Sequence, residues 1–328
     1  MVGAFGTDAG VINRFPRKEF IMTFKRGWHI AAAILMWVAA LLQGEMAKAG
    51  APVITKDIEI AQVDGTPLHV DMAVPSPAPE GKMPVLFTIH GGGWKDGTHH
   101  NLGRLCGDMT SRDFIIVSIE YRPIPTSVWP AQLQDCLRAV RWMRANAAKY
   151  QADPDRFAAW GESAGAHLAA CTAIYADDPA FADTGAFAGV SAKLQAVACG
   201  ATPADVLYSE TNHLNKGVRW NLETLLGGPP EKNEAAWKQA TCALNARKDL
   251  PPFFLYHGDR DNVIPLAESE HFAAALRSAG VPVELIVVQG GGHDPFSSVD
   301  KTKPIEPDRA KLMNCTITFL ETHLKPKP

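Results

Sequence analysis

The sequence predicts an α/β fold, in which a mostly parallel central sheet carries helices on both faces. Two observations lead to this prediction. Between residues 85 and 323, short apolar runs of strand length alternate with longer amphipathic segments of helical period. The chain has 328 residues, of which 46% are hydrophobic and 20% charged, so it can bury a large core. Strands that alternate with helices need crossover connections, and these cover both faces of a parallel sheet.

The sheet is predicted to open with a hairpin, residues 58–63 and 68–74, because Asp64-Gly65 between them is a turn sequence. The other expected strands are residues 85–89, 114–119, 157–160, 194–197, 253–256 and 283–288. Helices are expected at residues 101–111, 132–149, 164–175, 266–278 and 309–323.

Residues 203–250 are too long for a simple loop, and two short helices are expected there. This segment is either a small cap over a pocket or an excursion packed on the sheet edge, and the pattern does not distinguish the two.

A G-x-S-x-G sequence follows the strand at residues 157–160 and precedes the next helix. It consists of Gly161-Glu162-Ser163-Ala164-Gly165. Glycines without Cβ atoms let a strand and a helix crowd around a sharply bent serine, whose hydroxyl is thereby exposed. The free N–H groups at the start of the helix face any negative charge that forms nearby.

Three further signals follow apolar strands. The loop His90-Gly91-Gly92-Gly93-Trp94 comes after residues 85–89, and its backbone can approach a substrate closely. Asp259 and Asp261 follow residues 253–256, and His293 follows residues 283–288. Because α/β sheets place their sites at the carboxyl ends of parallel strands, we expect these residues to meet there.

These motifs resemble the α/β-hydrolase fold and, within it, the H-G-G-G-W / G-E-S-A-G esterases. That group includes bacterial feruloyl and acetyl-xylan esterase-like proteins and is hormone-sensitive-lipase-like. The resemblance runs from about Thr55 to the C-terminus. It implies a serine carboxylic-ester hydrolase for small or medium acyl or aryl esters, with no metal or cofactor. One departure is the loop at residues 199–205, where relatives tend to have Y-G-P-T-D-L, so the substrate cannot be carried over.

The resemblance also implies the roles of the site residues. Ser163 would be the nucleophile, His293 the base and Asp261 the orienting acid, with Asp259 as the rival acid. The oxyanion hole would comprise the N–H groups of Gly92, Gly93 and Ala164. Trp94 and Trp129 are candidates for the substrate pocket, although buried tryptophans are more often core residues.

Outside these motifs, no sequence pattern indicates a metal site. His99 and His100 lie in a polar segment without ligand partners, so solvated histidines are favoured over a metal site. The six cysteines show no C-x-x-C spacing, and buried thiols are favoured, with a lone disulfide left open.

The N-terminal segment is predicted to be a signal peptide at residues 22–49, with cleavage after Ala49. Lys25 and Arg26 precede an apolar stretch at residues 30–42, and Ala47-Lys48-Ala49 follows. Residues 1–21 are interpreted as an upstream extension and residues 50–328 as one domain. The alternative is an uncleaved membrane anchor, but the stretch is short for a spanning helix. We therefore expect a periplasmic or secreted protein without stable membrane insertion after cleavage.

The net charge limits the kinds of partner that we expect. The chain has a formal charge of −3, and residues 1–49 contain six basic and three acidic residues, so the remainder carries −6. An acidic protein is not expected to bind nucleic acid, whose backbone is also negatively charged. The expected partner is a substrate, either a small-molecule ester or a polysaccharide-linked ester. Alternatives are an arylformamidase, peptidase or lactonase with the same triad, or a non-catalytic binding module. Oligomeric state is not indicated.

Overall fold

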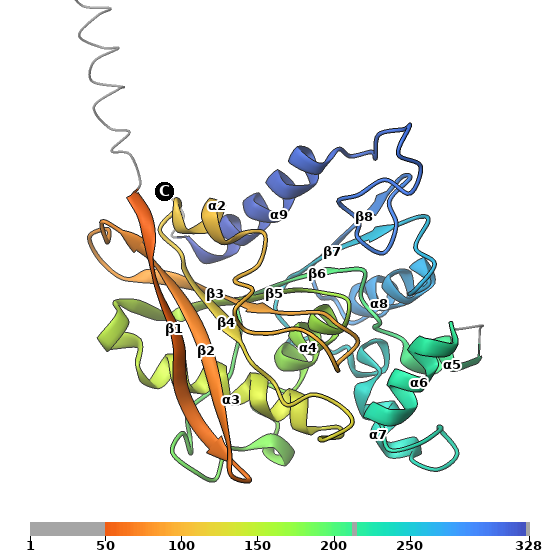
Figure 1. Ribbon diagram of the computed structural model, residues 1–328, viewed down its shortest axis with the longest axis horizontal. Coiled ribbons are helices and arrows are strands. Elements are labelled where there is room, and N and C mark those ends of the chain that lie inside the picture. Colours follow the sequence, from red (N-terminus) through yellow and green to blue (C-terminus); the bar gives the residue numbers. More distant parts are fainter. Residues whose placement is uncertain (1–49, 212–214, 326–328) are drawn as a thin grey trace, which may run out of the picture. The chain divides into compact units, whose positions relative to one another are not determined.

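The computed structural model describes residues 50–211 and 215–325 (Figure 1). The predicted signal peptide at residues 22–49 and the upstream extension at residues 1–21 lie outside the described residues. Within the described ranges, every helix is too short or too polar to cross a membrane.

The sheet has eight strands in the order β1-β2-β4-β3-β5-β6-β7-β8 (Figure 1). The first two form the predicted hairpin, and β2 also pairs antiparallel with β4, whereas the remaining strands are parallel. This confirms the predicted fold class. The strands are β1 (Gly50–Val63), β2 (Thr66–Ser76), β3 (Met83–Ile89), β4 (Ile115–Ile119), β5 (Ala152–Glu162), β6 (Ala196–Gly200), β7 (Phe253–Gly258) and β8 (Val283–Val288).

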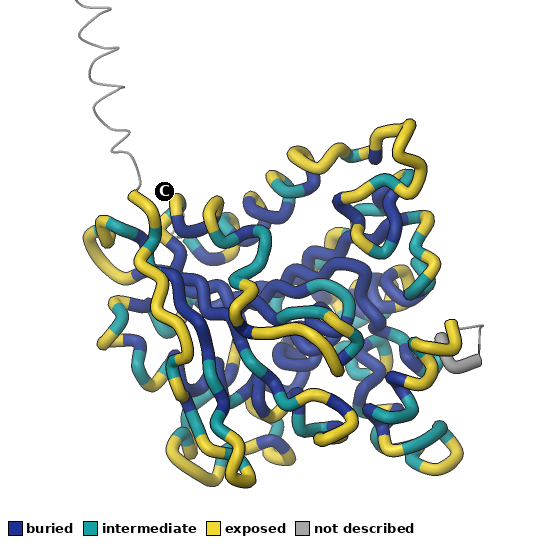
Figure 2. Tube along the Cα trace, viewed as in Figure 1, coloured by how far each residue is buried: buried dark blue, intermediate teal, exposed yellow. Residues whose placement is uncertain are grey.

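Alternate side chains of the central strands enter two separate cores, one on each face of the sheet. Phe87 and Phe157 belong to one core, and their neighbours Leu86 and Ala158 belong to the other. Both faces are therefore apolar, as expected for strands covered by helices on each side, and the central strands are dark blue in Figure 2. The first core includes residues of α3 (Ala131–Ala145), α4 (Ala164–Ile174) and α8 (Leu266–Ser278), and the second includes residues of α2 (Cys106–Thr110) and α9 (Arg309–Leu324).

The helix predicted at residues 101–111 is much shorter than expected, since α2 spans only Cys106–Thr110. Gly103 explains the difference. It has a φ of 82°, and a Cβ atom there would lie 2.7 Å from the Trp160 ring. The backbone of the preceding segment thus packs on the sheet in a conformation that is not helical.

Residues 203–250 contain more helix than the two short helices predicted. They form α5 (Val206–Thr211), α6 (Lys216–Leu225), α7 (Glu234–Ala240) and the 3-10 helix η3 (Cys242–Asn245). Helix α6 is amphipathic and buries Leu222 and Leu225. Its Val218 and Asn221 line the pocket described below, so this segment contributes to the site, as the cap interpretation requires.

Close approach between α4 and β3 depends on Gly165. A Cβ atom there would lie 2.0 Å from the carbonyl oxygen of Ile89 and 2.7 Å from that of His90. We expect Gly165→Ala to lower the free energy of unfolding by about 1–3 kcal/mol or more, because backbone must move. Denaturant unfolding measures this. Gly107→Ala in α2 is the matched control, since its Cβ atom meets nothing within 4 Å and the helix should gain stability slightly.

Candidate active site

Ser163 occupies a strained turn between β5 and α4. Its backbone has φ 55° and ψ −126°, a region that non-glycine residues rarely adopt. The turn is held by a hydrogen bond from the Ser163 N–H to the Gly200 carbonyl (2.9 Å) and by the contact of two glycines. A Cβ atom on Gly161 would lie 2.4 Å from the carbonyl carbon of Gly165. The glycines of the motif thus permit the bend that exposes the serine hydroxyl.

The structure brings together the three side chains predicted to form a triad. His293 Nε2 lies 3.0 Å from Ser163 Oγ, and His293 Nδ1 lies 2.8 Å from Asp261 Oδ2. A carboxylate can only accept, so the Nδ1–H of His293 donates to Asp261. This leaves the lone pair of Nε2 directed at the serine hydroxyl, the tautomer that a proton acceptor needs.

Asp261 is fixed by more partners than the sequence suggested. Its side chain is buried, and Oδ1 accepts hydrogen bonds from the N–H groups of Val263 (2.8 Å) and Ile264 (3.0 Å). His257 Nε2 lies 3.1 Å from Oδ2. Burial alone would raise the pKa of Asp261, but the hydrogen bonds from His257, His293 and the backbone outweigh it and hold the pKa well below the ordinary value. Asp261 is therefore a stable anion beside His293.

His257 lies near the carboxyl end of β7 and is buried. It also contacts the carboxylate that holds His293. Its Nδ1 lies 2.8 Å from Ser269 Oγ, and its Nε2 lies 3.0 Å from the carbonyl oxygen of Ile264. Both ring nitrogens of His257 thus have polar partners, and His257 helps to position the Asp261 carboxylate. Only the short spacing between His257 and Asp261 could have signalled this from the sequence.

The rival acid, Asp259, faces another group. Its Oδ1 accepts a hydrogen bond from the Gly290 N–H at 2.6 Å, which ties β7 to the loop carrying His293. Asp261, not Asp259, contacts the imidazole of His293.

The glycine loop after β3 adopts backbone conformations that favour glycine. Gly92 and Gly93 have φ values of 110° and 61°, and a Cβ atom on Gly92 would lie 2.0 Å from the Asp96 carbonyl oxygen. His90 supports the loop, since its ring stacks on Tyr121 with the centroids 4.3 Å apart and its Nδ1 lies 2.9 Å from the Gly91 carbonyl oxygen. Ala164 is buried at the first position of α4, where helix N–H groups lack intrahelical partners.

A pocket of about 450 Å³ opens beside Ser163 and His293. Loops at the carboxyl ends of the strands form it together with helix α6. The lining residues are Gly91, Gly92, Gly93, Trp94, Lys95, Asp96, Arg104, Glu162, Ser163, Val218, Asn221, Val263, Ile264, His293 and Asp294.

The two tryptophans predicted for the pocket differ in their placement. Trp94 lines it, although only 2% of its surface is exposed, and its Nε1–H donates to His167 Nδ1 (3.3 Å). Trp129 is not among the lining residues; it packs against His167 and donates to Gln239 Oε1 at 2.7 Å. Burial lowers the pKa of His167 to about 4, so this histidine is a neutral link between the two indoles.

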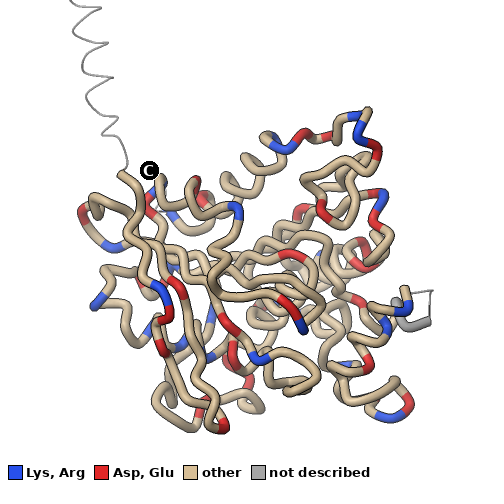
Figure 3. Tube along the Cα trace, viewed as in Figure 1, with Lys and Arg blue, Asp and Glu red and all other residues tan. Residues whose placement is uncertain are grey.

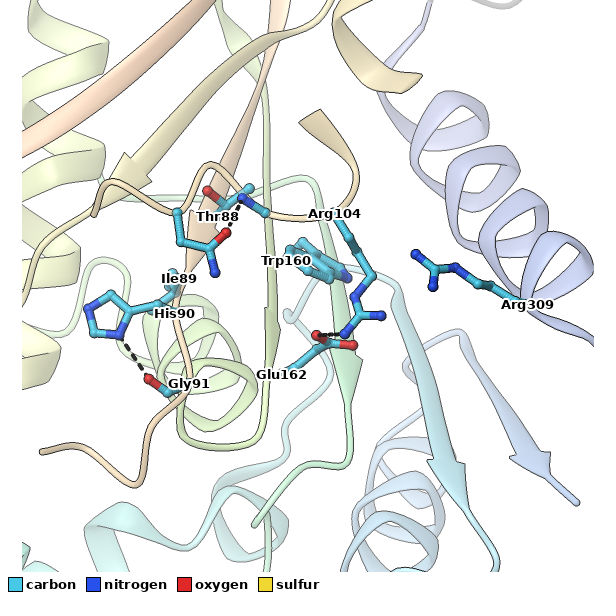
Figure 4. Close-up of a pocket in the computed structure, with 10 residues that line it drawn as sticks. Thr88, Ile89, His90, Gly91, Arg104, Trp160, Glu162 and Arg309 are labelled. Atoms are coloured by element: carbon cyan, nitrogen blue, oxygen red, sulfur yellow. Dashed lines mark hydrogen bonds and ion pairs between the residues drawn. The ribbon is translucent and has the colours of Figure 1, made fainter. Parts of the chain in front are cut away.

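A second pocket of about 350 Å³ adjoins the first, and the two share Gly91, Arg104 and Glu162. Figure 4 shows Arg104 and Glu162 in contact, with Arg309 directed toward them from α9. Arg104 Nη2 lies 3.0 Å from Glu162 Oε2 and 3.2 Å from Asp294 Oδ1. Burial raises the pKa of the Glu162 carboxyl, and the Arg104 charge opposes this. The arginine thus bridges the neighbours of Ser163 and His293.

The prediction that His99 and His100 are solvated is wrong for His99. Only 5% of its surface is exposed, and both histidines contact carboxylates on the first two strands. The sequence could not reveal this, because Asp57 and Asp71 come close to His99 and His100 only after the β1–β2 hairpin has folded.

The parallel sheet and a Ser–His–Asp arrangement on a nucleophile turn define an α/β-hydrolase-fold protein with a serine-hydrolase-type site. The BD-FAE family model matches residues 70–276. The chain belongs to this family, which confirms the resemblance inferred from the sequence.

Curated relatives and solved structures agree with this assignment. Esterase LipQ of Mycobacterium tuberculosis is 35% identical over 226 residues, 68% of this chain and 52% of LipQ. A probable isoprenylcysteine alpha-carbonyl methylesterase of Oryza sativa is 29% identical over 77% of this chain and 59% of its own length. The chain thus spans little more than half of these relatives.

Two solved structures share the fold. One is Thermogutta terrifontis esterase 2 phosphonylated by sarin, with 25% identity, a TM-score of 0.68 and coverage of 86% of this chain and 98% of that one. The other is a truncated carbohydrate esterase from gut microbiota, with 22% identity, a TM-score of 0.69 and coverage of 84% and 98%.

Proposed function

We propose that the protein is a serine carboxylic-ester hydrolase that acts through an acyl-enzyme intermediate. The observation that carries the proposal is the continuous contact from Ser163 Oγ through the His293 ring to Asp261. Family membership and the esterase names of the relatives support the same reaction.

In the proposed mechanism, His293 Nε2 accepts the Ser163 proton as Oγ attacks the ester carbonyl carbon. The negative charge that develops on the carbonyl oxygen is stabilised by the N–H groups of Gly92, Gly93 and Ala164. Collapse of the tetrahedral intermediate expels the alcohol, which takes the proton from His293. Water then attacks the acyl-enzyme in the same way, and Asp261 stabilises the imidazolium in both steps.

The proposed substrates are small or medium acyl or aryl esters whose alcohol portion is polar. The second pocket favours this choice, because charged side chains of Arg104, Glu162 and Arg309 line it and it adjoins the serine. A carbohydrate-linked ester fits such a pocket, and one solved structure with this fold is a carbohydrate esterase. Over residues 50–211 and 215–325, Figure 3 shows acidic and basic residues interspersed, without a long basic stretch of the kind that favours nucleic acid.

We further propose a periplasmic or secreted location, which rests on the signal-peptide pattern at residues 22–49. An arylformamidase, peptidase or lactonase could use the same three side chains, and only substrate comparison separates these activities.

Labelling with a fluorophosphonate probe tests for an activated serine. We expect stoichiometric labelling of the wild-type chain at Ser163, located by mass spectrometry of the labelled peptide. A binding module without an activated serine would remain unlabelled. A parallel panel of acetyl, butyryl, octanoyl and feruloyl esters, N-formylkynurenine and a proline amide defines the substrate class. Faster turnover of either amide than of every ester would contradict the esterase proposal.

A further inference from the structure

Four side chains with metal-binding atoms converge at the edge of the sheet formed by the hairpin. Asp57 comes from β1, Asp71 from β2, and His99 and His100 from the loop between β3 and α2 (Figure 1). One ligand atom from each lies within 4.8 Å of all the others. The sequence did not indicate this group, because the histidines lie at least 28 positions along the chain from either aspartate.

Three distances between ligand atoms of these side chains are comparable to the edges of a coordination tetrahedron. With Zn–N and Zn–O bonds near 2.0–2.1 Å, neighbouring ligands lie about 3.3 Å apart. His99 Nε2 lies 3.0 Å from Asp57 Oδ1 and 3.7 Å from Asp71 Oδ1. His100 Nδ1 lies 3.0 Å from Asp71 Oδ2. Asp71 contacts the two histidines through different oxygens, so both of its carboxylate oxygens face the cluster.

Charge gives a separate reason to expect a cation. The side chain of Asp71 is 0% exposed, and a buried carboxylate is costly without a positive partner. In the described part of the chain, no lysine or arginine forms an ion pair with Asp71. Its partners are the two histidines and the Asp57 N–H, which donates to Oδ1 at 2.8 Å. A divalent ion would compensate both aspartates at once.

The surroundings of His99 fit the same interpretation. Its Nε2 faces the aspartates, while its Nδ1 is buried, has no hydrogen-bond partner among the described residues and lies 3.5 Å from Glu120 Oε1. A metal-bound histidine usually directs its other ring N–H to a carboxylate, which fixes the tautomer. Glu120 is placed to accept that N–H once a metal holds the ring.

We propose that Asp57, Asp71, His99 and His100 form a structural site for one divalent transition-metal ion, with Zn²⁺ as the best match. Imidazole and carboxylate donors in a four-coordinate arrangement suit Zn²⁺, and four protein ligands leave no open position for catalysis. The ion would join the hairpin to the loop that begins with the oxyanion glycines. This proposal does not depend on the proposed esterase activity.

Zinc binding by the full chain tests the site. The purified protein is stripped with a chelator, titrated with Zn²⁺ against a chromogenic competitor and checked by elemental analysis, and its thermal unfolding is followed with and without Zn²⁺. We expect one Zn²⁺ per chain and a higher Tm with the metal. Asp57→Asn and His100→Gln should each weaken binding by at least about 10–100-fold, and Glu120→Gln by about 10–100-fold.

His271→Gln is the matched control, because His271 Nδ1 also pairs with an aspartate, Asp205, at 2.8 Å but lies outside the cluster. It should bind Zn²⁺ as the wild-type chain does. The Asp57→Asn variant is expected to fold, since 60% of the Asp57 side chain is exposed. A loss of Zn²⁺ binding in this variant would therefore not be explained by misfolding. The proposal is overturned if the wild-type chain binds no more Zn²⁺ than a folded Asp57→Asn variant, or if Zn²⁺ leaves Tm unchanged.

Discussion

Ser163→Ala is expected to lower kcat for p-nitrophenyl acetate by about 10⁴–10⁶-fold, because the proposed reaction loses its nucleophile. The residual rate would come from the glycine loop and from binding alone. The fold should persist, since the change removes one oxygen, whose side-chain contact in the described residues is with His293. Steady-state kinetics together with circular dichroism and thermal unfolding measure both properties.

Ser297→Ala is a suitable control for the same substitution. Ser297 is exposed and its hydroxyl donates to Asp294 Oδ2 at 2.9 Å, outside the residues that line the pocket. Its kcat should stay near that of the wild-type enzyme. If the Ser163→Ala protein kept even a tenth of the wild-type rate after contaminating esterases were excluded, Ser163 would not be the nucleophile.

Asn at position 261 is expected to lower kcat by about 10⁴-fold with little change in KM. The imidazole would lose its orienting anion, and an amide N–H group facing His293 Nδ1 would also favour the wrong tautomer. The loss should be visible across the whole pH range in which the wild-type enzyme is active, because Asp261 is ionised throughout that range.

Asp259→Asn separates the two aspartates of the same turn. Its side-chain oxygen can still accept the Gly290 N–H, so the loop that carries His293 should be retained and kcat should change little. A larger loss of kcat in Asp259→Asn than in Asp261→Asn would contradict the assignment of the acid.

The sequence predicted the sheet well because strands buried on both faces are continuous apolar runs, as at residues 85–89 and 253–256. The meeting of Ser163, Asp261 and His293 was also predictable, since each comes within a few residues of a strand end and glycines mark the turn around Ser163. Predictions from local sequence patterns were wrong where contacts between distant residues determine the structure. Trp129 was predicted to line the pocket, but it packs on His167. Residues 101–105 were predicted to be helical, but they are not, because Gly103 packs closely on Trp160.

The bridge made by Arg104 has a consequence for how the reacting groups are kept in line. One guanidinium group restrains Glu162 and Asp294, the immediate chain neighbours of Ser163 and His293. It also faces the cavity in which we propose that the alcohol portion binds. A ligand that binds the Arg104 guanidinium in this cavity would therefore change how firmly Glu162 and Asp294 are held, and with them the alignment of the Ser163 hydroxyl and the His293 ring. Substitutions of Arg104 should therefore change substrate selectivity and kcat together.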